Sequence, residues 1–434
     1  ASGQTRNLTE GMPGYDKYPV FSPDDSMLAF TSMERAGNES DKSRLFVETL
    51  ATGEKRYLTR NFDYNAGNVR WDGNGTLYFI APVRGTYQVC RVDLADDSVR
   101  VLTAGAHDVN AITLNGGELV GEVTSLSAPT ELFRIDPADG TMTRITNTNP
   151  EIYDHIRMGE VRERWIRTTD GRQMLTWVVL PPDFDSTERY PALLYCQGGP
   201  QSVVSQFWSY RWNLQLMAAQ GYVVVAPNRR GVPSFGQQWL DQISGDYSGQ
   251  NIRDYLSAID DVAAEPWVDG CRLGCVGASY GGYSVFFLAG HHQKRFKAFI
   301  AHCGMFNLES MYGATEELWF PNNDLGGPYW SDDTTAQRSY ANSPHKFVKN
   351  WDTPILIFSG QGDFRIPYTE SLQAFTAARL MGVPSRLVSF EDEAHQIFKP
   401  QNSLVWNREF FGWLDKYLKH TETDSAQSPD SSKR

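Results

Sequence analysis

The feature that most constrains the fold is an alternation of strand-like and helix-like segments from about residue 160 onward. The strand-like segments are mostly apolar and lie at 192–196, 222–227, 272–277, 296–302, 354–360 and 385–390. The helix-like segments between and after them lie at 252–264, 368–382 and 403–419. Strands this apolar must be buried on both faces. The alternation therefore predicts a mostly parallel, doubly wound sheet covered by helices.

The first 150 residues contain a different pattern, a repeat that ends in a threonine. "RNLT" ends at Thr9, "RYLT" at Thr59, "RVLT" at Thr103 and "TRIT" at Thr146, and the last three are about 44 residues apart. An Asp- or Gly-containing turn precedes each of those three. Alternating strands at this period indicate four-stranded propeller blades, the alternative being a small open β-domain that only alternates.

The repeat also predicts how the chain divides. The opening "TRNLT" resembles the last strand of a blade, and the three complete blades that follow are too few for a ring of about four to eight. We therefore expect a partial all-β propeller over 1–155, an α/β domain over 156–420 and a disordered polar tail over 421–434. On this interpretation the chain is the C-terminal part of a longer protein.

Composition excludes some functions. The net charge of −12 argues against a nucleic-acid partner, which needs a basic face. No apolar run reaches the length of about 18–20 residues needed for a membrane span, and no signal peptide opens the chain. The five cysteines are expected to be structural thiols, with a disulfide left open: Cys90, Cys196, Cys271, Cys275 and Cys303. No second Cys/His pair stands at zinc spacing, so we expect no metal and no cofactor.

A serine motif gives the first indication of chemistry. Gly277-Ala278-Ser279-Tyr280-Gly281 fits the G-x-S-x-G nucleophile elbow of α/β hydrolases. The motif alone is a weak signal, but here it lies between an apolar strand and a helix-like segment, as an elbow must. A serine needs an adjacent base to become nucleophilic. The motif therefore predicts Ser279 as the nucleophile and requires a histidine and an acid elsewhere.

The base and the acid should follow in the order acid, then histidine, each after a strand. His395 directly follows the strand-like segment 385–390, whereas His420 lies where the last helix meets the polar tail, so we predict His395 as the base. Asp363 follows the strand-like segment 354–360 and is the predicted acid. Asp392, three residues from His395, is the competing candidate.

An acyl-transfer site also needs two donors for the oxyanion of its tetrahedral intermediate. The backbone N–H of Tyr280, the residue after the nucleophile, is one candidate. The other is expected from "QGGPQ", where Gly198 and Gly199 allow bare backbone to approach. An ordinary turn is the alternative interpretation of that stretch.

Together these motifs resemble the prolyl-oligopeptidase family of serine peptidases. The matching stretches are "GGPQ", "NRRGVPSFG", "GASYGGYS", "SGQGDFRIP" and "EDEAHQI", and they run through nearly all of residues 160–418. The resemblance implies an α/β hydrolase preceded by a propeller, with Gly199 and Tyr280 supplying the oxyanion hole. Within the family, the bacterial dipeptidyl-peptidase branch is most similar, and the acylaminoacyl-peptidase branch is close behind.

The same resemblance implies substrate-binding residues. Four aromatic residues are candidates for the wall of an apolar specificity pocket: Tyr283, Tyr312, Trp319 and Phe320. Arg365 stands where family members place a group that contacts a substrate carbonyl. Core packing is the alternative for the aromatic residues, and a surface ion pair is the alternative for Arg365.

The sequence departs from the family in two places. The residue before "GGP" is usually histidine or tyrosine, and here it is Gln197, which favours a backbone donor at that position. In related dipeptidyl peptidases, propeller acids bind the free amine of the substrate. The blades expected to carry them are not in this chain, so no amine-binding residue is assigned.

The sequence therefore predicts a serine exopeptidase that releases dipeptides from the N-termini of short peptides. The alternatives are an acylaminoacyl-peptidase or oligopeptidase of the same family, a carboxylesterase, and an inactive propeller–hydrolase scaffold. A homodimer is possible. The resemblance favours a periplasmic or secreted location.

Overall fold

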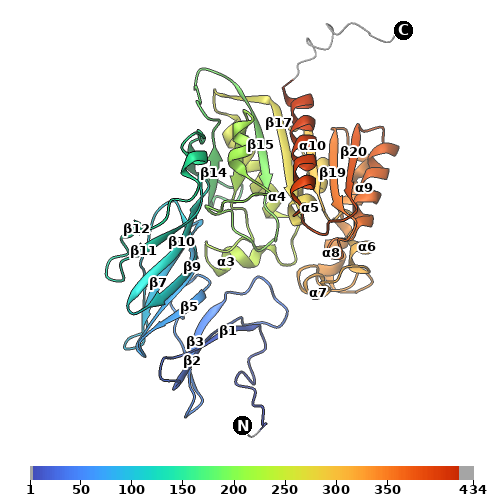
Figure 1. The fold of residues 1–434 in the computed structure, drawn as a ribbon. Helices are drawn as coiled ribbons and strands as arrows, with labels where there is room; N and C mark the ends of the chain where they lie inside the picture. Colours follow the sequence, from blue (N-terminus) through green and yellow to red (C-terminus); the bar gives the residue numbers. More distant parts are fainter. Residues whose placement is uncertain (1–2, 420–434) are drawn as a thin grey trace, which may run out of the picture. The chain divides into compact units, whose positions relative to one another are not determined.

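The computed structural model describes residues 3–419, and Figure 1 shows their fold. His420 and the tail predicted for 421–434 lie outside the described residues. Chain contacts divide the molecule into two compact units. The first holds Ala1–Ile156, Val203–Trp208 and Gly231–Ser244, and the second holds Arg157–Ser202, Ser209–Arg230 and Gly245–Arg434. The last two segments of the first unit fall in the range that the sequence assigns to the second domain.

The first unit contains three four-stranded antiparallel sheets, each formed by strands consecutive in sequence. The first sheet comprises β1 (Asp16–Phe21), β2 (Met27–Ser32), β3 (Arg44–Thr49) and β4 (Glu54–Tyr57). The second comprises β5 (Gly67–Asp72), β6 (Thr76–Val83), β7 (Thr86–Asp93) and β8 (Ser98–Val101). The third comprises β9 (Asp108–Asn115), β10 (Glu118–Ser125), β11 (Ala128–Ile135) and β12 (Met142–Arg144). The prediction of N-terminal β-blades is confirmed.

The repeated threonine ends each blade by the same pair of hydrogen bonds. In the second blade, Leu102 N–H donates to the carbonyl of Val89 (2.7 Å), and the Thr103 hydroxyl accepts from Val89 N–H (2.9 Å). Thr59 and Thr146 accept from the third strands of their own blades in the same way, at 3.0 and 2.9 Å. The hydroxyl thus replaces the next backbone acceptor at the end of the ladder, which explains the recurring threonine.

The opening repeat is an exception. Residues 5–9, expected to be the last strand of another blade, form no strand in the described structure. The side chain of Asn7 instead accepts hydrogen bonds from the N–H and hydroxyl of Thr9, and Met12 N–H closes a turn onto Thr9. A strand forms only where a neighbour takes up its backbone hydrogen bonds. In the described structure, residues 5–9 reach a strand through the side chain of Arg6, which donates to Glu48 on β3 (3.2 Å), and not through backbone pairing.

The second unit is built on one eight-stranded sheet, in the order β13-β14-β16-β15-β17-β18-β19-β20. In chain order, the strands are β13 (Val161–Arg167), β14 (Gln173–Val179), β15 (Tyr190–Cys196), β16 (Val223–Pro227), β17 (Val268–Ala278), β18 (Ala298–His302), β19 (Ile355–Gly360) and β20 (Ser385–Phe390). β14 pairs antiparallel with β13 and with β16, and all other pairs are parallel. Every residue of β16, β18 and β19 is buried, so both faces of the sheet centre are covered. The predicted α/β hydrolase fold is confirmed.

Helices connect and flank the strands (Figure 1). The longer ones are α4 (Gln250–Ala263), α5 (Tyr280–Ala289), α8 (Thr334–Ala341), α9 (Tyr368–Leu380) and α10 (Pro400–Leu418). The shorter ones are α1 (Pro150–Tyr153), α2 (Leu214–Ala219), α3 (Gln237–Leu240), α6 (Leu308–Tyr312) and α7 (Trp319–Asp324), with 3₁₀ turns at Asp241–Ile243 and Pro344–Asn350. Helix α5 packs on β17 and β18. Ser279 lies between the end of β17 and the start of α5, and therefore at the carboxyl edge of the sheet.

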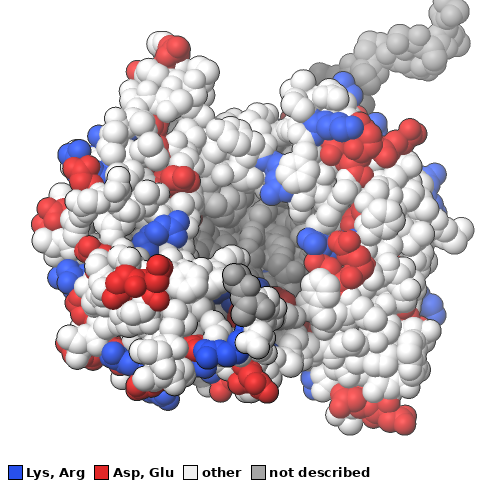
Figure 2. Space-filling model, turned by 60° about the horizontal axis from the view of Figure 1, so that its bottom comes forward, with Lys and Arg blue, Asp and Glu red and all other residues white. Residues whose placement is uncertain are grey.

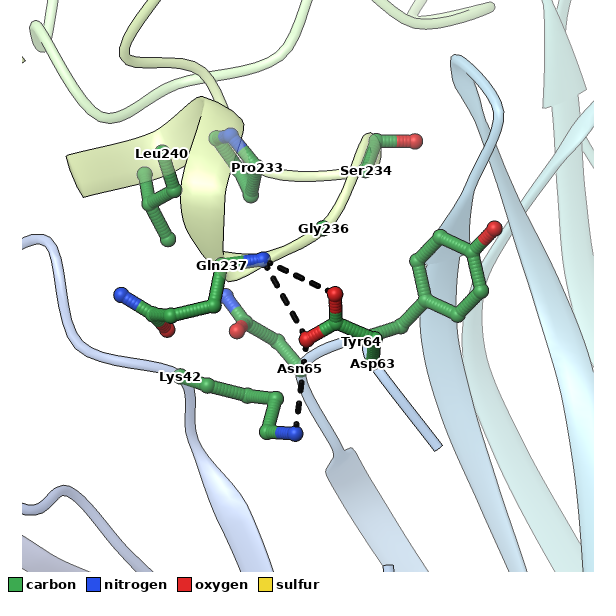
Figure 3. Close-up of a pocket in the computed structure, with 9 residues that line it drawn as sticks. All are labelled: Lys42, Asp63, Tyr64, Asn65, Pro233, Ser234, Gly236, Gln237 and Leu240. Atoms are coloured by element: carbon green, nitrogen blue, oxygen red, sulfur yellow. Dashed lines mark hydrogen bonds and ion pairs between the residues drawn. The ribbon is translucent and has the colours of Figure 1, made fainter. Parts of the chain in front are cut away.

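The segment Gly231–Ser244 is held to the blades by backbone and carboxylate contacts. The hydroxyl of Ser234 accepts from Gly85 N–H (2.6 Å), and the carboxylate of Asp63 accepts from Gln237 N–H (3.2 Å). Figure 3 shows Asp63 between Gln237 and Lys42, whose Nζ lies 3.5 Å from the carboxylate. The small hollow around these residues has room for about one water molecule, so it is too small for a peptide.

The surface bears charges of both signs. On the face that Figure 2 shows, Lys and Arg side chains are interspersed with Asp and Glu, and no continuous basic surface forms there. Of the helices in the described part of the chain, none combines the length and apolar character needed to cross a membrane.

Candidate active site

Ser279 occupies a sharp turn between strand β17 and helix α5. Its backbone has φ 60° and ψ −122°, which L-residues adopt only where the surroundings enforce it. Its N–H donates to the carbonyl of His302 on the next strand (2.9 Å). This conformation places the partly buried Ser279 at the carboxyl edge of the sheet, as expected of a nucleophile elbow.

The glycines around Ser279 are required by close backbone contacts. A Cβ on Gly281 would lie 2.1 Å from the carbonyl oxygen of Cys196, and one on Gly277 would lie 2.6 Å from the carbonyl oxygen of Gly281. Gly282 is equally confined, because its Cβ would lie 2.7 Å from the Cα of Gly304. The run of glycines therefore lets α5 begin directly against β15 and β18.

His395 lies against Ser279. Its Nε2 is 3.0 Å from Ser279 Oγ, and its Nδ1 is 2.7 Å from Asp363 Oδ2. His395 follows β20 and Asp363 follows β19, so the sheet brings together three residues far apart in sequence. The carboxylate makes Nδ1 the protonated nitrogen, which leaves the electron pair of Nε2 directed at the serine hydroxyl.

Asp363 is fixed from two sides. Its side chain is fully buried, and its Oδ1 accepts from the N–H groups of Arg365 (3.0 Å) and Ile366 (2.9 Å). The competing candidate lies elsewhere, because Asp392 pairs with Lys399 (2.6 Å). Among the candidates, the structure brings Asp363 to the histidine.

The neighbours of His395 change its basicity. Burial alone lowers the pKa of this imidazole, but Cys303 and Asp363 beside it raise the pKa to about 10. Burial alone raises the pKa of the Cys303 thiol, but the imidazoles of His395 and His302 lower it to about 6. Only the unprotonated imidazole can act as the base, so accepting the proton of the Ser279 hydroxyl requires Nε2 of His395 to be free of a proton.

The two expected oxyanion donors lie on segments that meet at Ser279. Tyr280 is the first residue of α5, so its N–H has no acceptor one turn earlier in the helix. The loop after β15 passes close by, since a Cβ on Gly198 would lie 3.6 Å from Ser279 Cβ. Gly199 has φ 115°, which favours glycine. The side chain of Gln197 is engaged by Tyr195 (2.7 Å) and Ser202 (3.0 Å).

Arg229 connects these two segments, and its place in "NRRG" is the one feature of the sequence that could have indicated it. It follows β16 and is fully buried. Its guanidinium donates to the carbonyls of Pro200 (3.0 Å) and Gln197 (3.4 Å), which flank the two glycines. The same group lies 4.6 Å from the ring centroid of Tyr280. One buried cation thus holds the loop and the start of α5.

The predicted pocket residues do not form one surface. Tyr283 is buried, with its ring 5.5 Å from Tyr280, which favours core packing. Tyr312 is buried and donates to Asn322 (2.7 Å). Trp319 is 45% exposed at the start of α7, and Phe320 follows it, so α7 offers the accessible aromatic surface.

Arg365 forms an ion pair. Its Nη2 lies 2.7 Å from Glu317 and 3.6 Å from Glu316, and its side chain is half exposed. This agrees with the ion-pair alternative, and a contact with substrate remains a prediction.

One further residue that the sequence did not indicate lies at this site. Cys303, expected to be an inert structural thiol, lies with its Sγ 4.0 Å from His395 Nε2. Cys303, Asp363 and His395 offer ligand atoms within 4.8 Å of one another and are the candidate metal-binding group of the described residues. The five cysteines are free thiols, and Cys271 is the exposed one.

The chain is similar to known proteins in sequence and in fold. Residues 208–421 match the model of the prolyl oligopeptidase family. A protein named dipeptidyl-peptidase 5 from Porphyromonas gingivalis is 53% identical over 421 residues, which make up 96% of this chain and 61% of the relative. Its namesake from Porphyromonas endodontalis is 51% identical over 422 residues, with the same two shares.

Among solved structures, acylaminoacyl peptidase from Pyrococcus horikoshii superposes with a TM-score of 0.82 at 22% identity. The match covers 93% of this chain and 63% of that one, and at this identity it establishes the shared fold. The chain spans 61% of the length of the two Porphyromonas relatives.

Proposed function

We propose, on the premise that this chain belongs to the prolyl oligopeptidase family, that it is a serine peptidase acting through Ser279, His395 and Asp363. The observation that carries the proposal is the pair of contacts from His395, 3.0 Å to Ser279 and 2.7 Å to Asp363. These contacts supply a nucleophile, a base within reach of it and a carboxylate that orients the base.

In the proposed reaction, Ser279 Oγ attacks the carbonyl carbon of the scissile peptide bond while His395 Nε2 takes its proton. Asp363 holds the imidazole in place and stabilises its protonated form. The C–N bond then breaks, and the leaving amine receives the proton from His395. Water hydrolyses the acyl-enzyme by the same steps in reverse order, with His395 again as base and then acid.

The oxyanion of each tetrahedral intermediate is assigned to the N–H groups of Tyr280 and Gly199. Donors already in position at the point of developing charge contribute strongly in such sites. Losing one typically lowers kcat about 10²–10³-fold. Arg229 is assigned the role of a positioning residue, since it contacts both donor-bearing segments.

The finer proposal is that the leaving product is an N-terminal dipeptide. It is supported by the name of the two similar Porphyromonas proteins and by the sequence resemblance to that branch. Amine recognition is not assigned to any residue of this chain.

Chromogenic dipeptidyl substrates with free and with acylated N-termini test both the proposed peptidase activity and the proposed release of dipeptides. We expect release from the free-amine substrates, and loss of release in Ser279→Ala with unchanged thermal unfolding. Cleavage restricted to N-acylated substrates would replace the dipeptidyl assignment with an acylaminoacyl-peptidase. Cleavage of short acyl esters and of no peptide would leave an esterase.

A further inference from the structure

The thiol of Cys303 lies beside the imidazole of His395, although the two residues are 92 positions apart. Sγ is 4.0 Å from Nε2 and 3.3 Å from the backbone oxygen of His395. Cys303 follows β18, and its N–H donates to Phe358 (2.9 Å) in a left-handed backbone conformation with φ 40°. The thiol is thus fixed beside the proposed base, and the proposed reaction does not use it.

The other contacts of His395 suit its Nε2 to a metal ion. A histidine that binds metal through one nitrogen usually donates its other N–H to a carboxylate, and Asp363 already fills that position. Ser279 Oγ lies 3.0 Å from the same Nε2. One sulfur and one oxygen therefore lie within 4.0 Å of the same nitrogen.

The spacing is close to that of a tetrahedral site. Zn–S and Zn–N bonds of about 2.3 and 2.0 Å at a tetrahedral angle place sulfur and nitrogen about 3.5 Å apart. The observed 4.0 Å exceeds this by about 0.5 Å, which small rotations of the two side chains can close. Thiolate and imidazole ligands favour zinc and similar soft cations over magnesium and calcium.

A second buried imidazole interacts with the thiol. His302 is 2% exposed, and its Nδ1 accepts from the indole N–H of Trp406 (3.1 Å). Its Nε2 therefore carries the proton, and the Cys303 sulfur is its partner in the described part of the chain. A thiolate bound to a metal ion can still accept such a hydrogen bond, as metal ligands commonly do from their outer partners.

We propose that Cys303 Sγ and His395 Nε2, with Ser279 Oγ as a third ligand, bind one zinc(II) or similar soft divalent cation that inhibits the enzyme. On binding, the thiol loses its proton to solvent, and sulfur and nitrogen each donate an electron pair to the cation. Nε2 can then no longer accept the proton of Ser279. Inhibition rests on the proposed function, whereas binding does not.

Binding is tested by titrating cobalt(II) into the Cys271→Ser chain, which lacks the exposed thiol. We expect sulfur-to-cobalt charge-transfer absorption that zinc removes. Adding Cys303→Ala or His395→Ala should abolish the absorption, while Cys90→Ala, a buried thiol in the blades, should retain it. Absence of the band, or its survival in either site variant, would overturn the proposal. Two site variants are used so that misfolding of one leaves the other to decide.

Inhibition is tested on the same Cys271→Ser background, with each variant normalised to its own metal-free rate. The zinc concentration for half-inhibition should rise by about tenfold or more in Cys303→Ala, since loss of even an outer partner costs about 10–100-fold in metal affinity. Equal zinc sensitivity of the Cys271→Ser chain and of the same chain with Cys303→Ala added would contradict the inhibitory role. If no peptide is cleaved at all, the proposed function fails, and the cobalt titration still decides the binding site.

Discussion

Gly282 shows at the scale of one residue how tightly the site is built. Its neighbour Gly281 belongs to the elbow motif, but Gly282 lies outside it and is confined by a different strand. The structure places it against the backbone turn that carries Cys303. A backbone neighbour cannot rotate away as a flexible side chain can, so added volume here must displace β18 or α5.

We expect Gly282→Ala to lower the free energy of unfolding by about 1–3 kcal/mol, the usual cost of overpacking. The matched control is Gly412→Ala on α10, where a Cβ meets nothing within 4 Å. That change should stabilise the chain by about 0.5–1 kcal/mol, as alanine for glycine does in an exposed helix. Chemical denaturation measures both, and equal effects of the two changes would contradict the crowding at Gly282.

At the scale of elements, Arg229 is predicted to affect catalysis through the two segments that it holds. We expect Arg229→Met to lower kcat by about 10²-fold with a smaller change in KM, the effect of misplacing one oxyanion donor. Arg229→Lys, which keeps the charge but not the planar fork, should recover only part of the rate. Steady-state kinetics beside thermal unfolding separates the effects. A loss of stability with unchanged kcat would assign Arg229 a purely structural role.

The blades make a second prediction at this scale. Thr103→Val removes the acceptor for Val89 N–H and the donor to Gln88, both buried. We expect a loss of about 1–3 kcal/mol, the cost of leaving a buried polar group without its partner. Thr143→Val, on the exposed edge strand β12, is the control and should change little. Denaturant midpoints of the two variants measure the difference in stability. A Thr103 variant as stable as the control would show that the bond from Val89 N–H to the Thr103 hydroxyl does not stabilise the blade.

The elements themselves were predictable where local pattern determines them. The apolar strands of the second unit and helices α4, α9 and α10 follow from periodicity, because burial on both faces demands continuous apolar runs. The repeat predicted the three blades. Residues 5–9 carry the same repeat and form no strand, since pairing depends on a neighbour that the local pattern does not reveal.

The site was predictable only in part for a related reason. Ser279, Asp363 and His395 each follow a strand, and strand order places strand ends together, so topology indicates which residues meet. Cys303 and Arg229 act through side-chain contacts with segments distant in sequence. Nothing in the local sequence around Cys303 or Arg229 specifies those contacts. Tyr283 was a candidate for the wall of the specificity pocket, but its ring packs in the core.

At the scale of the whole chain, one buried carboxyl links pH to stability within the first unit. Asp108 accepts from Tyr87 N–H (3.0 Å) and from the hydroxyl of Ser205 (2.6 Å), 97 positions away. Burial raises its pKa to about 6, although these hydrogen bonds partly oppose the shift. The folded chain therefore holds this proton over a range in which the unfolded chain has released it.

The sign follows from that difference. Since the pKa in the folded chain is above the unfolded value of about 3.9, this group's contribution to stability falls as pH rises from about 4 to 6. We expect Asp108→Asn to flatten the pH dependence of unfolding in this window by up to about 3 kcal/mol. Denaturation at pH 4.5 and 7 measures the difference. An identical pH dependence in the two chains would contradict the raised pKa.

The most direct test of the central claim is mass spectrometry of the products from one unmodified peptide and its N-acetylated copy. The account predicts free dipeptides released stepwise from the unmodified peptide, none from the acetylated one, and no products with Ser279→Ala. It also predicts a transient acyl adduct on Ser279. Dipeptide release that persists in Ser279→Ala would contradict the assignment of this serine, His395 and Asp363 as the acyl-transfer site.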